Sequence, residues 1–163
     1  MAFDAAGNLY FSDLSNRRVR RVSPAGIITT VAGNGNLAYA GDGGPATAAS
    51  IAFPYGVAVD AVGTLFIGDS GSNVVRRVSS GGIITTLAGT GVAGFSGDGG
   101  PAAAAQLQGP RGLTVDEAGN LMIADSGNGR IRWIGGDGRI TTLVGPGIAS
   151  PSGVAVGPDG LLY

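Results

Sequence analysis

Short apolar runs separated by clusters of glycine, asparagine, aspartate and serine recur along the whole chain. In the middle of the chain, four such runs, rich in β-branched, aliphatic or aromatic residues, occupy 56–59, 65–69, 74–78 and 83–88. Their lengths, and the glycine-containing turns between them, are typical of four antiparallel strands. No segment has a convincing helical period, although 46–49 and 102–107 each have room for one short helical turn. The pattern predicts an all-β fold.

This pattern repeats every 56 residues. Of the 56 residue pairs between 2–57 and 58–113, 29 are identical. The register aligns two distinctive sets of charged residues: Asp13, Asp69 and Asp125, and Arg20, Arg76 and Arg132. The Pro-x-Gly at 110–112 is followed by the next one at 151–153 after only 41 residues, so the longer copies carry a removable segment of 15 residues. That segment contains Gly-Asp-Gly-Gly-Pro-Ala.

A minimal unit of about 41 residues lies within the range of one β-propeller blade. We therefore expect 1–163 to form a single propeller segment of about three four-stranded blades and a partial fourth. The expected limits are 2–33, 54–89 and 110–145 for the blades, 151–163 for the partial blade, and 34–53 and 90–109 for the long loops. Because the chain begins inside a first strand and stops inside a second, both ends should expose strand edges that favour pairing.

Composition excludes several classes of site. The chain has no cysteine and no histidine, which removes disulfides, thiolate metal sites and the commonest general base. Ten basic residues balance eleven acidic ones, and few aromatics lie among the arginines, so we expect neither nucleic acid nor membrane as a partner. Each Gly-Asp-Gly-Gly segment offers one carboxylate, whereas calcium takes 6 to 8 oxygens. We expect no metal and no cofactor.

The third copy resembles the NHL repeat. Residues 110–116 read Pro-Arg-Gly-Leu-Thr-Val-Asp, and 119–132 read Gly-Asn-Leu-Met-Ile-Ala-Asp-Ser-Gly-Asn-Gly-Arg-Ile-Arg. The long-insert form, with Gly-Phe-Ser-Gly-Asp-Gly-Gly-Pro-Ala at 94–102, is similar to repeats of large secreted bacterial proteins and, more loosely, of teneurins. The resemblance covers essentially the whole chain and is weaker at 14–18. It implies a ring of about six blades, of which this chain would hold half, and a secreted or periplasmic location.

Two sources would complete such a ring. A second copy, arranged head to tail as a homodimer, would place 153–156 of one chain beside 9–13 of the other. Alternatively, the missing blades belong to a larger parent protein. A designed or evolutionary fragment whose only activity is self-assembly is a third interpretation.

Strands alternate in direction within a blade, so the long loops and the turns between second and third strands should emerge on one face. We call this the loop face. Scaffolded loops are where repeat folds place recognition, so a protein or small ligand would bind there. The candidate residues are Asn16, Arg18, Tyr39, Asp42, Tyr55, Asn73, Phe95, Asp98, Arg111, Asn128 and Arg130.

The recurring aspartates and arginines are interpreted as structural, because a residue that occurs once per blade does one structural job per blade. The aspartate would accept N–H groups of a turn, and the arginine would pair with it or with a neighbouring blade. A non-enzymatic binding scaffold is therefore the favoured function. Similar six-bladed propellers include lyases and lactonases, whose sites use histidine or an asymmetric acidic set. Here such residues would have to lie in other blades, because the only glutamate, Glu117, falls in a turn.

Overall fold

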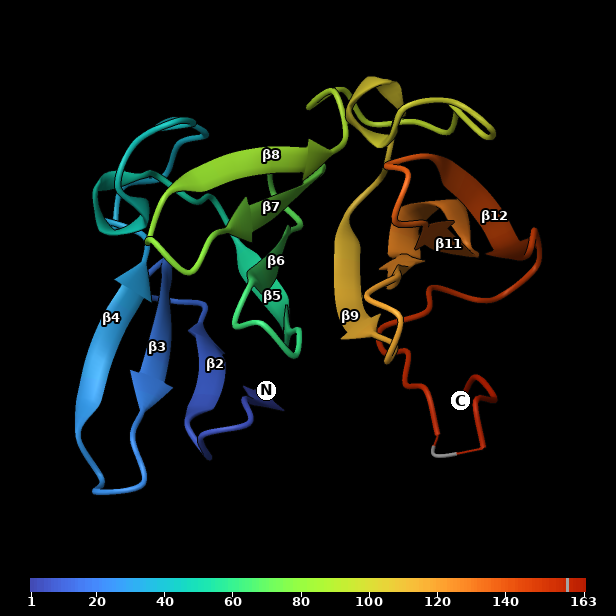
Figure 1. The fold of residues 1–163 in the computed structure, drawn as a ribbon. Coiled ribbons are helices and arrows are strands. Elements are labelled where there is room, and N and C mark those ends of the chain that lie inside the picture. The colour runs from blue at the N-terminus through green and yellow to red at the C-terminus, as the bar shows by residue number, and fades with distance from the viewer. Residues whose placement is uncertain (158) are drawn as a thin grey trace.

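The computed structural model describes residues 1–157 and 159–163, and its strands form three four-stranded antiparallel sheets. Blade 1 contains β1 (Ala2–Phe3), β2 (Leu9–Asp13), β3 (Arg18–Val22) and β4 (Ile28–Ala32). Blade 2 contains β5 (Pro54–Val59), β6 (Leu65–Asp69), β7 (Val74–Val78) and β8 (Ile84–Ala88). Blade 3 contains β9 (Pro110–Val115), β10 (Leu121–Asp125), β11 (Arg130–Ile134) and β12 (Ile140–Val144). Figure 1 shows the sheets side by side in an arc, which confirms the predicted all-β propeller segment.

Local chemistry explains the hairpins. Between β5 and β6, the Asp60 carboxylate accepts the N–H groups of Val62 and Thr64, and Gly63 takes a left-handed φ of 82°. An aspartate of this kind mimics a backbone turn and fixes where the chain reverses. The same aspartate and glycine recur in the first hairpins of the other two blades.

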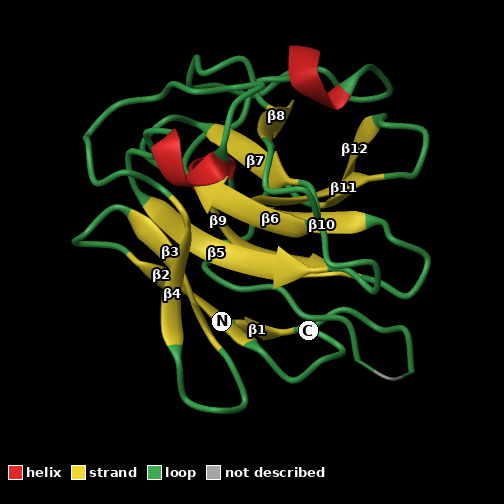
Figure 2. Ribbon diagram, turned by 60° about the vertical axis from the view of Figure 1, so that its left-hand side comes forward, coloured by secondary structure: helices red, strands yellow, loops and turns green. Residues whose placement is uncertain are grey.

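The long loops contain little regular structure. Each has one turn of 3₁₀ helix, η1 (Ala46–Ala48) and η2 (Ala102–Ala104), which lie at the loop end of the sheets (Figure 2). The third such turn, η3 (Ser126–Asn128), connects β10 to β11. Within the described part of the chain, no helix is long and apolar enough to cross a membrane.

Each blade buries its faces against its neighbours. On β6, Leu65 and Ile67 pack toward blade 1, whereas Phe66 packs toward blade 3. This follows from the two-residue period of a strand, which turns successive side chains to opposite faces. The core therefore consists of layers between blades, and a blade without a neighbour leaves one apolar face open.

The last residues begin a further blade. Ala155 and Tyr163 exchange two backbone hydrogen bonds of 3.0 and 2.9 Å, and Val156 bridges to Leu162. Val154 packs with Val156 and Leu162 on the face of blade 3 formed by Met122 and Ala124.

Candidate functional site

Each long loop is fastened to the blade that follows it by a buried arginine. Arg76 of β7 is fully buried and donates hydrogen bonds to the Asp42 carboxylate (2.5 Å) and to the carbonyls of Ala40 and Ser50. The second oxygen of Asp42 accepts the N–H of Thr86 in β8 at 2.9 Å. The Gly-Asp-Gly-Gly segment thus delivers one carboxylate to a guanidinium of the next blade.

The same fastening recurs one repeat later, with one addition. Arg132 donates to Asp98 at 2.8 Å, to the carbonyls of Ser96 and Gln106, and to Asp125 at 3.4 Å. Asp125 has no exposed surface and also accepts the Gln108 N–H at 2.8 Å and the Asn128 amide at 2.8 Å. In blade 2, Asp69 accepts the N–H groups of Ala52 and Phe53. These aspartates therefore accept hydrogen bonds from the last backbone N–H groups of the long loop, just before the first strand begins.

The electrostatics of the carboxylates follow their surroundings. Burial raises the pKa of Asp125 above its ordinary value, although Asn128, the Gln108 N–H and the Arg132 guanidinium oppose that shift. For Asp42, partial burial acts in the same direction, but the hydrogen bonds from Thr86 and the charge of Arg76 outweigh it. The pKa of Asp42 therefore lies below its ordinary value.

This lowered pKa gives a pH-dependent contribution to stability. The folded chain holds fewer protons on Asp42 than the unfolded chain does near the ordinary aspartate pKa, so the contribution is present above that pKa and lost as the pH falls through the folded value. We expect Asp42→Asn to lower the free energy of unfolding by about 1 to 2 kcal/mol at pH 7. The difference from wild type should shrink below about pH 4.

Urea denaturation at pH 7, 5 and 3 measures this difference. Asp137→Asn is the matched control, because the Asp137 to Arg139 pair is exposed and 3.8 Å apart, and we expect a change below about 0.5 kcal/mol. A difference for Asp42→Asn that stays constant with pH would contradict the assignment.

Tyr39 and Phe95 of the long loops lie against these arginines. Arg76 lies 5.0 Å from the ring centroid of Tyr39, whose hydroxyl is 2.6 Å from that of Thr86. Two guanidinium groups lie over the Phe95 ring, with Arg130 3.8 Å and Arg132 4.8 Å from the ring centroid. Such contacts hold a loop against the next sheet.

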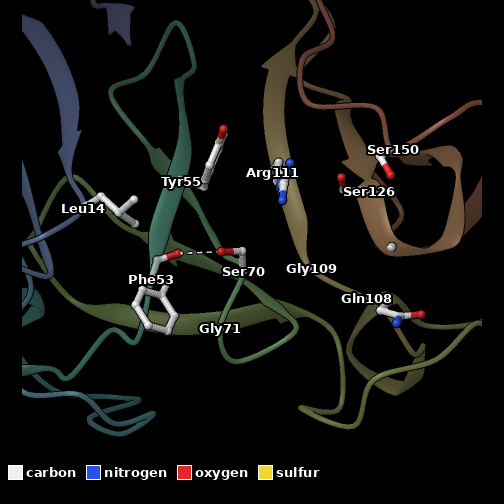
Figure 3. A pocket seen from close by; sticks show the side chains of 11 residues that line it. Leu14, Phe53, Tyr55, Ser70, Gly71, Gln108, Gly109, Arg111, Ser126 and Ser150 are labelled. Atoms are coloured by element: carbon white, nitrogen blue, oxygen red, sulfur yellow. Dashed lines mark hydrogen bonds between the residues drawn. The ribbon is translucent and has the colours of Figure 1, made fainter.

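The first strand of each blade is called its inner strand. A hollow of about 430 Å³ opens on the loop face between the inner strands of blades 2 and 3, β5 and β9 (Figure 3). Arg111 of β9 lies 5.2 Å from the ring centroid of Tyr55 of β5. Phe53 contributes its ring, while its carbonyl accepts the Ser70 hydroxyl at 3.1 Å. The residues that line the hollow are Leu14, Phe53, Tyr55, Ser70, Gly71, Gln108, Gly109, Arg111, Ser126, Gly127 and Ser150.

Of the eleven candidate residues named from the sequence, the structure places only Tyr55 and Arg111 in this hollow. Tyr39, Asp42, Phe95 and Asp98 contact the next blade as described above. The others form hydrogen bonds with turns and long loops: Asn16 to Asp13, Arg18 to the carbonyls of Asn16 and Asn34, Asn73 to the Gly109 N–H, Asn128 to Gly94 and Asp125, and Arg130 to the Asn128 carbonyl.

Sequence reasoning missed most of the lining, and a signal for it was available. Lining positions before and within the first strand of each blade carry a different residue in each copy that the repeat aligns. They are Phe53, Gly109 and Ser150 before the first strand, and Tyr55 and Arg111 within it. After the second strand, Leu14 of blade 1 differs from Ser70 and Ser126, which are identical. Recognition of a ligand needs different groups at one locus, whereas a scaffold needs the same group in every copy. Variation within an otherwise repeated register therefore marks the hollow.

The described residues contain no group of side chains that could hold a metal ion. Among the described residues, no three or more carboxylate side chains gather in a way that would hold an ion. The lining of the hollow contains no acidic side chain.

Comparison with known proteins gives the family. The Teneurin NHL domain model matches residues 35–96 and 93–148, which together span more than half of the chain. Human Teneurin-4 is 33% identical over 153 residues, covering 85% of this chain and 5% of that protein. SUPPRESSOR OF QUENCHING 1 from the chloroplast of Arabidopsis thaliana is 36% identical over 104 residues, covering 61% of this chain and 10% of that protein. The chain thus spans a tenth or less of these relatives.

Solved structures share the fold at lower identity. A gluconolactonase from Xanthomonas campestris superposes with a TM-score of 0.70 at 22% identity, over 98% of this chain and 50% of its own. The nidogen/laminin complex gives 0.67 at 23% identity, over 94% and 50%. A streptogramin B lyase gives 0.66 at 18% identity, over 97% and 44%. Three four-stranded blades, with long loops fastened to the second and third by repeated Asp and Arg residues, are consistent with the family match, which shows that this chain belongs to the NHL-repeat family, in the group described by the Teneurin NHL domain.

Proposed function

We propose that this chain is a non-enzymatic binding scaffold that holds its ligand in the hollow of the loop face. The observation that carries the proposal is the contrast between frame and lining. The aspartates at 13, 69 and 125 and the arginines at 20, 76 and 132 are identical in all three copies. The lining positions before and within the first strand, which hold Phe53, Gly109 and Ser150, and Tyr55 and Arg111, differ from copy to copy. Repeat folds gain selective recognition by varying surface positions on a constant frame.

The chemistry of the lining supports an anionic ligand with an apolar part. Among the described residues, Arg111 has no carboxylate partner within 4.0 Å, so its guanidinium is available to a carboxylate of a ligand. Tyr55 and Phe53 are both partly exposed beside it and offer apolar ring faces. A peptide or small molecule with a carboxylate next to an aromatic group fits this combination.

The lining favours binding over catalysis. Proton transfer in enzymes is carried chiefly by histidine, carboxylate, lysine, tyrosine or cysteine. Of these the lining contains only Tyr55, with no base beside it. Likeness to a lyase and a gluconolactonase at under 25% identity reflects the shared fold. Completion of the ring, by a second copy or by further blades, stays a prediction.

Two small probes test the proposal: N-acetyl-phenylalanine, which bears a carboxylate, and its neutral amide. We expect amide chemical-shift changes at Tyr55 and Arg111 in a ¹⁵N NMR titration, with the carboxylate binding about fivefold tighter than the amide. Arg111→Gln should abolish this preference, because it removes the cation and leaves Tyr55 in place.

Arg139→Gln is the control, since Arg139 is an exposed arginine outside the hollow. It should leave the preference unchanged. Equal binding of the two probes by the wild-type chain, or shifts confined to residues outside the hollow, would refute the proposal.

A further inference from the structure

One face of blade 1 has the same apolar positions as the faces of blades 2 and 3 that the long loops cover, but here these side chains are exposed. Ile84 and Ile140, at equivalent positions of β8 and β12, have no exposed surface. Their counterpart in β4, Ile28, is 50% exposed. Leu9, Phe11 and Val22 are partly exposed, whereas their counterparts in the other two blades are all buried.

The polar groups of this face lack the partners that their counterparts have. Asp69 accepts two loop N–H groups, but the hydrogen bond shown to Asp13 comes from the Asn16 amide at 2.9 Å. Arg76 and Arg132 each bind a loop carboxylate, but Arg20 donates to the Thr30 hydroxyl at 2.8 Å and has no carboxylate within 4.0 Å among the described residues. Blade 1 therefore presents a cation without an anion.

Backbone hydrogen bonds at the fourth strand of each blade also distinguish blade 1 from blades 2 and 3. The N–H of Ile84 donates to the Gly44 carbonyl at 3.0 Å, and its carbonyl accepts the Gly43 N–H at 2.8 Å. Ile140 makes the same two bonds with Gly100 and Gly99. In the described part of the chain, Ile28 has neither bond. An unpaired stretch of strand edge is a template for another extended segment.

We propose that the open face of blade 1 is a binding site for the Gly-Asp-Gly-Gly-Pro-Ala loop of another NHL repeat. The loop aspartate binds Arg20 and the Thr30 N–H, and its glycines pair with Ile28. The small and aliphatic residues that follow, equivalent to Ala46, Ala49 and Ile51, cover Leu9 and Phe11, as they cover Leu65 and Ile67 in blade 2.

A second copy of this chain fits the site less well. Both of its Gly-Asp-Gly-Gly loops are engaged on its own blades, through Asp42 and Asp98. Its remaining connection, 145–150, contains no acidic residue. Head-to-tail packing would cover Leu9 and Phe11 but leave the Arg20 guanidinium buried without a carboxylate, which is costly. The site therefore selects a repeat with the long insert.

The experiment is an extended chain in which residues 34–57 are duplicated directly before Ala2. Residue 57 is followed by Ala58 in blade 2 and by Ala2 in the extension, so the repeat register is preserved. Tethering gives the loop a high effective concentration at the site. We expect hydrogen exchange of the Ile28 and Thr30 amides to slow about tenfold or more relative to the unextended chain.

Two variants of the extended chain test the chemistry. Asn in place of the duplicated Asp42, and Arg20→Gln, should each abolish most of the added protection. Exchange of Ile84 in blade 2, which the extension does not touch, reports that these chains are folded. In the unextended chain, Arg20→Gln should leave Ile28 exchange unchanged.

Three results would overturn the proposal. The extension could leave Ile28 unprotected while Ile84 stays protected. It could protect Ile28 equally in the Arg20→Gln background, which would remove the role of the ion pair. Finally, light scattering could show that the unextended chain is a dimer with Ile28 already protected, which would make a second copy the occupant.

Discussion

Arg132→Ala is expected to lower the free energy of unfolding by about 3 to 5 kcal/mol. Arg132 has no exposed surface and joins Asp98 of the preceding loop to Asp125 of its own blade. Alanine would leave Asp125 buried without its cation, so that this carboxyl must stay charged and unpaired or take up a proton. It would also release the loop carbonyls of Ser96 and Gln106, which accept hydrogen bonds from the guanidinium.

Urea denaturation measures the loss, and Arg20→Ala provides the matched control. Arg20 occupies the same position in blade 1 but binds no carboxylate, so its replacement should cost less than about 1 kcal/mol. Arg132→Lys should fall between wild type and alanine, because an ammonium keeps the charge and loses the planar fork. Equal losses for Arg132→Ala and Arg20→Ala would show that the buried ion pairs do not stabilise the blades.

The strands could be predicted from the sequence because the residues that indicate them lie close together in the chain. The runs at 65–69 and 74–78 coincide with β6 and β7, and the predicted short helical turns appear as η1 and η2. Both depend on residues a few positions apart, and the repeat shows each signal several times. The family followed in the same way, since its pattern is made of turn and strand residues in a fixed order.

The blade that each long loop contacts could not be predicted from the sequence, because this contact depends on how segments far apart in the sequence meet. Asp42 and Arg76 are separated by 34 residues, and nothing in their spacing says that the loop crosses to the following blade. The repeat showed that both residues recur, which indicates a structural role without naming the partner. Tyr39 and Phe95 were named as ligand-binding candidates of the loop face, and the structure adds that arginines of the next blade lie over their rings, while the two residues stay 44% and 40% exposed.

The closeness of neighbouring inner strands leads to the second large effect, that of Gly56→Ala. A Cβ on Gly56 would lie 2.0 Å from the carbonyl oxygen of Arg111. That oxygen belongs to the backbone of β9, so no side-chain rotation relieves the overlap and the two blades must separate. We expect a loss of about 3 kcal/mol, at the upper end of the usual cost of overpacking. Because Tyr55 and Arg111 flank this contact, the preference for the carboxylate probe should weaken as well.

Gly136→Ala is the control, since its Cβ would meet nothing within 4 Å and its φ is not left-handed. It should change the free energy of unfolding by less than about 0.5 kcal/mol. Gly112→Ala should be intermediate: its Cβ would lie 2.6 Å from the Cα of Gly153, but among the described residues after β12 there is no strand to hold that atom in place. Equal stability of Gly56→Ala and Gly136→Ala would mean that the inner strands can move apart freely. The hollow would then have no fixed shape, because the rigid spacing of β5 and β9 is what holds Arg111 over Tyr55.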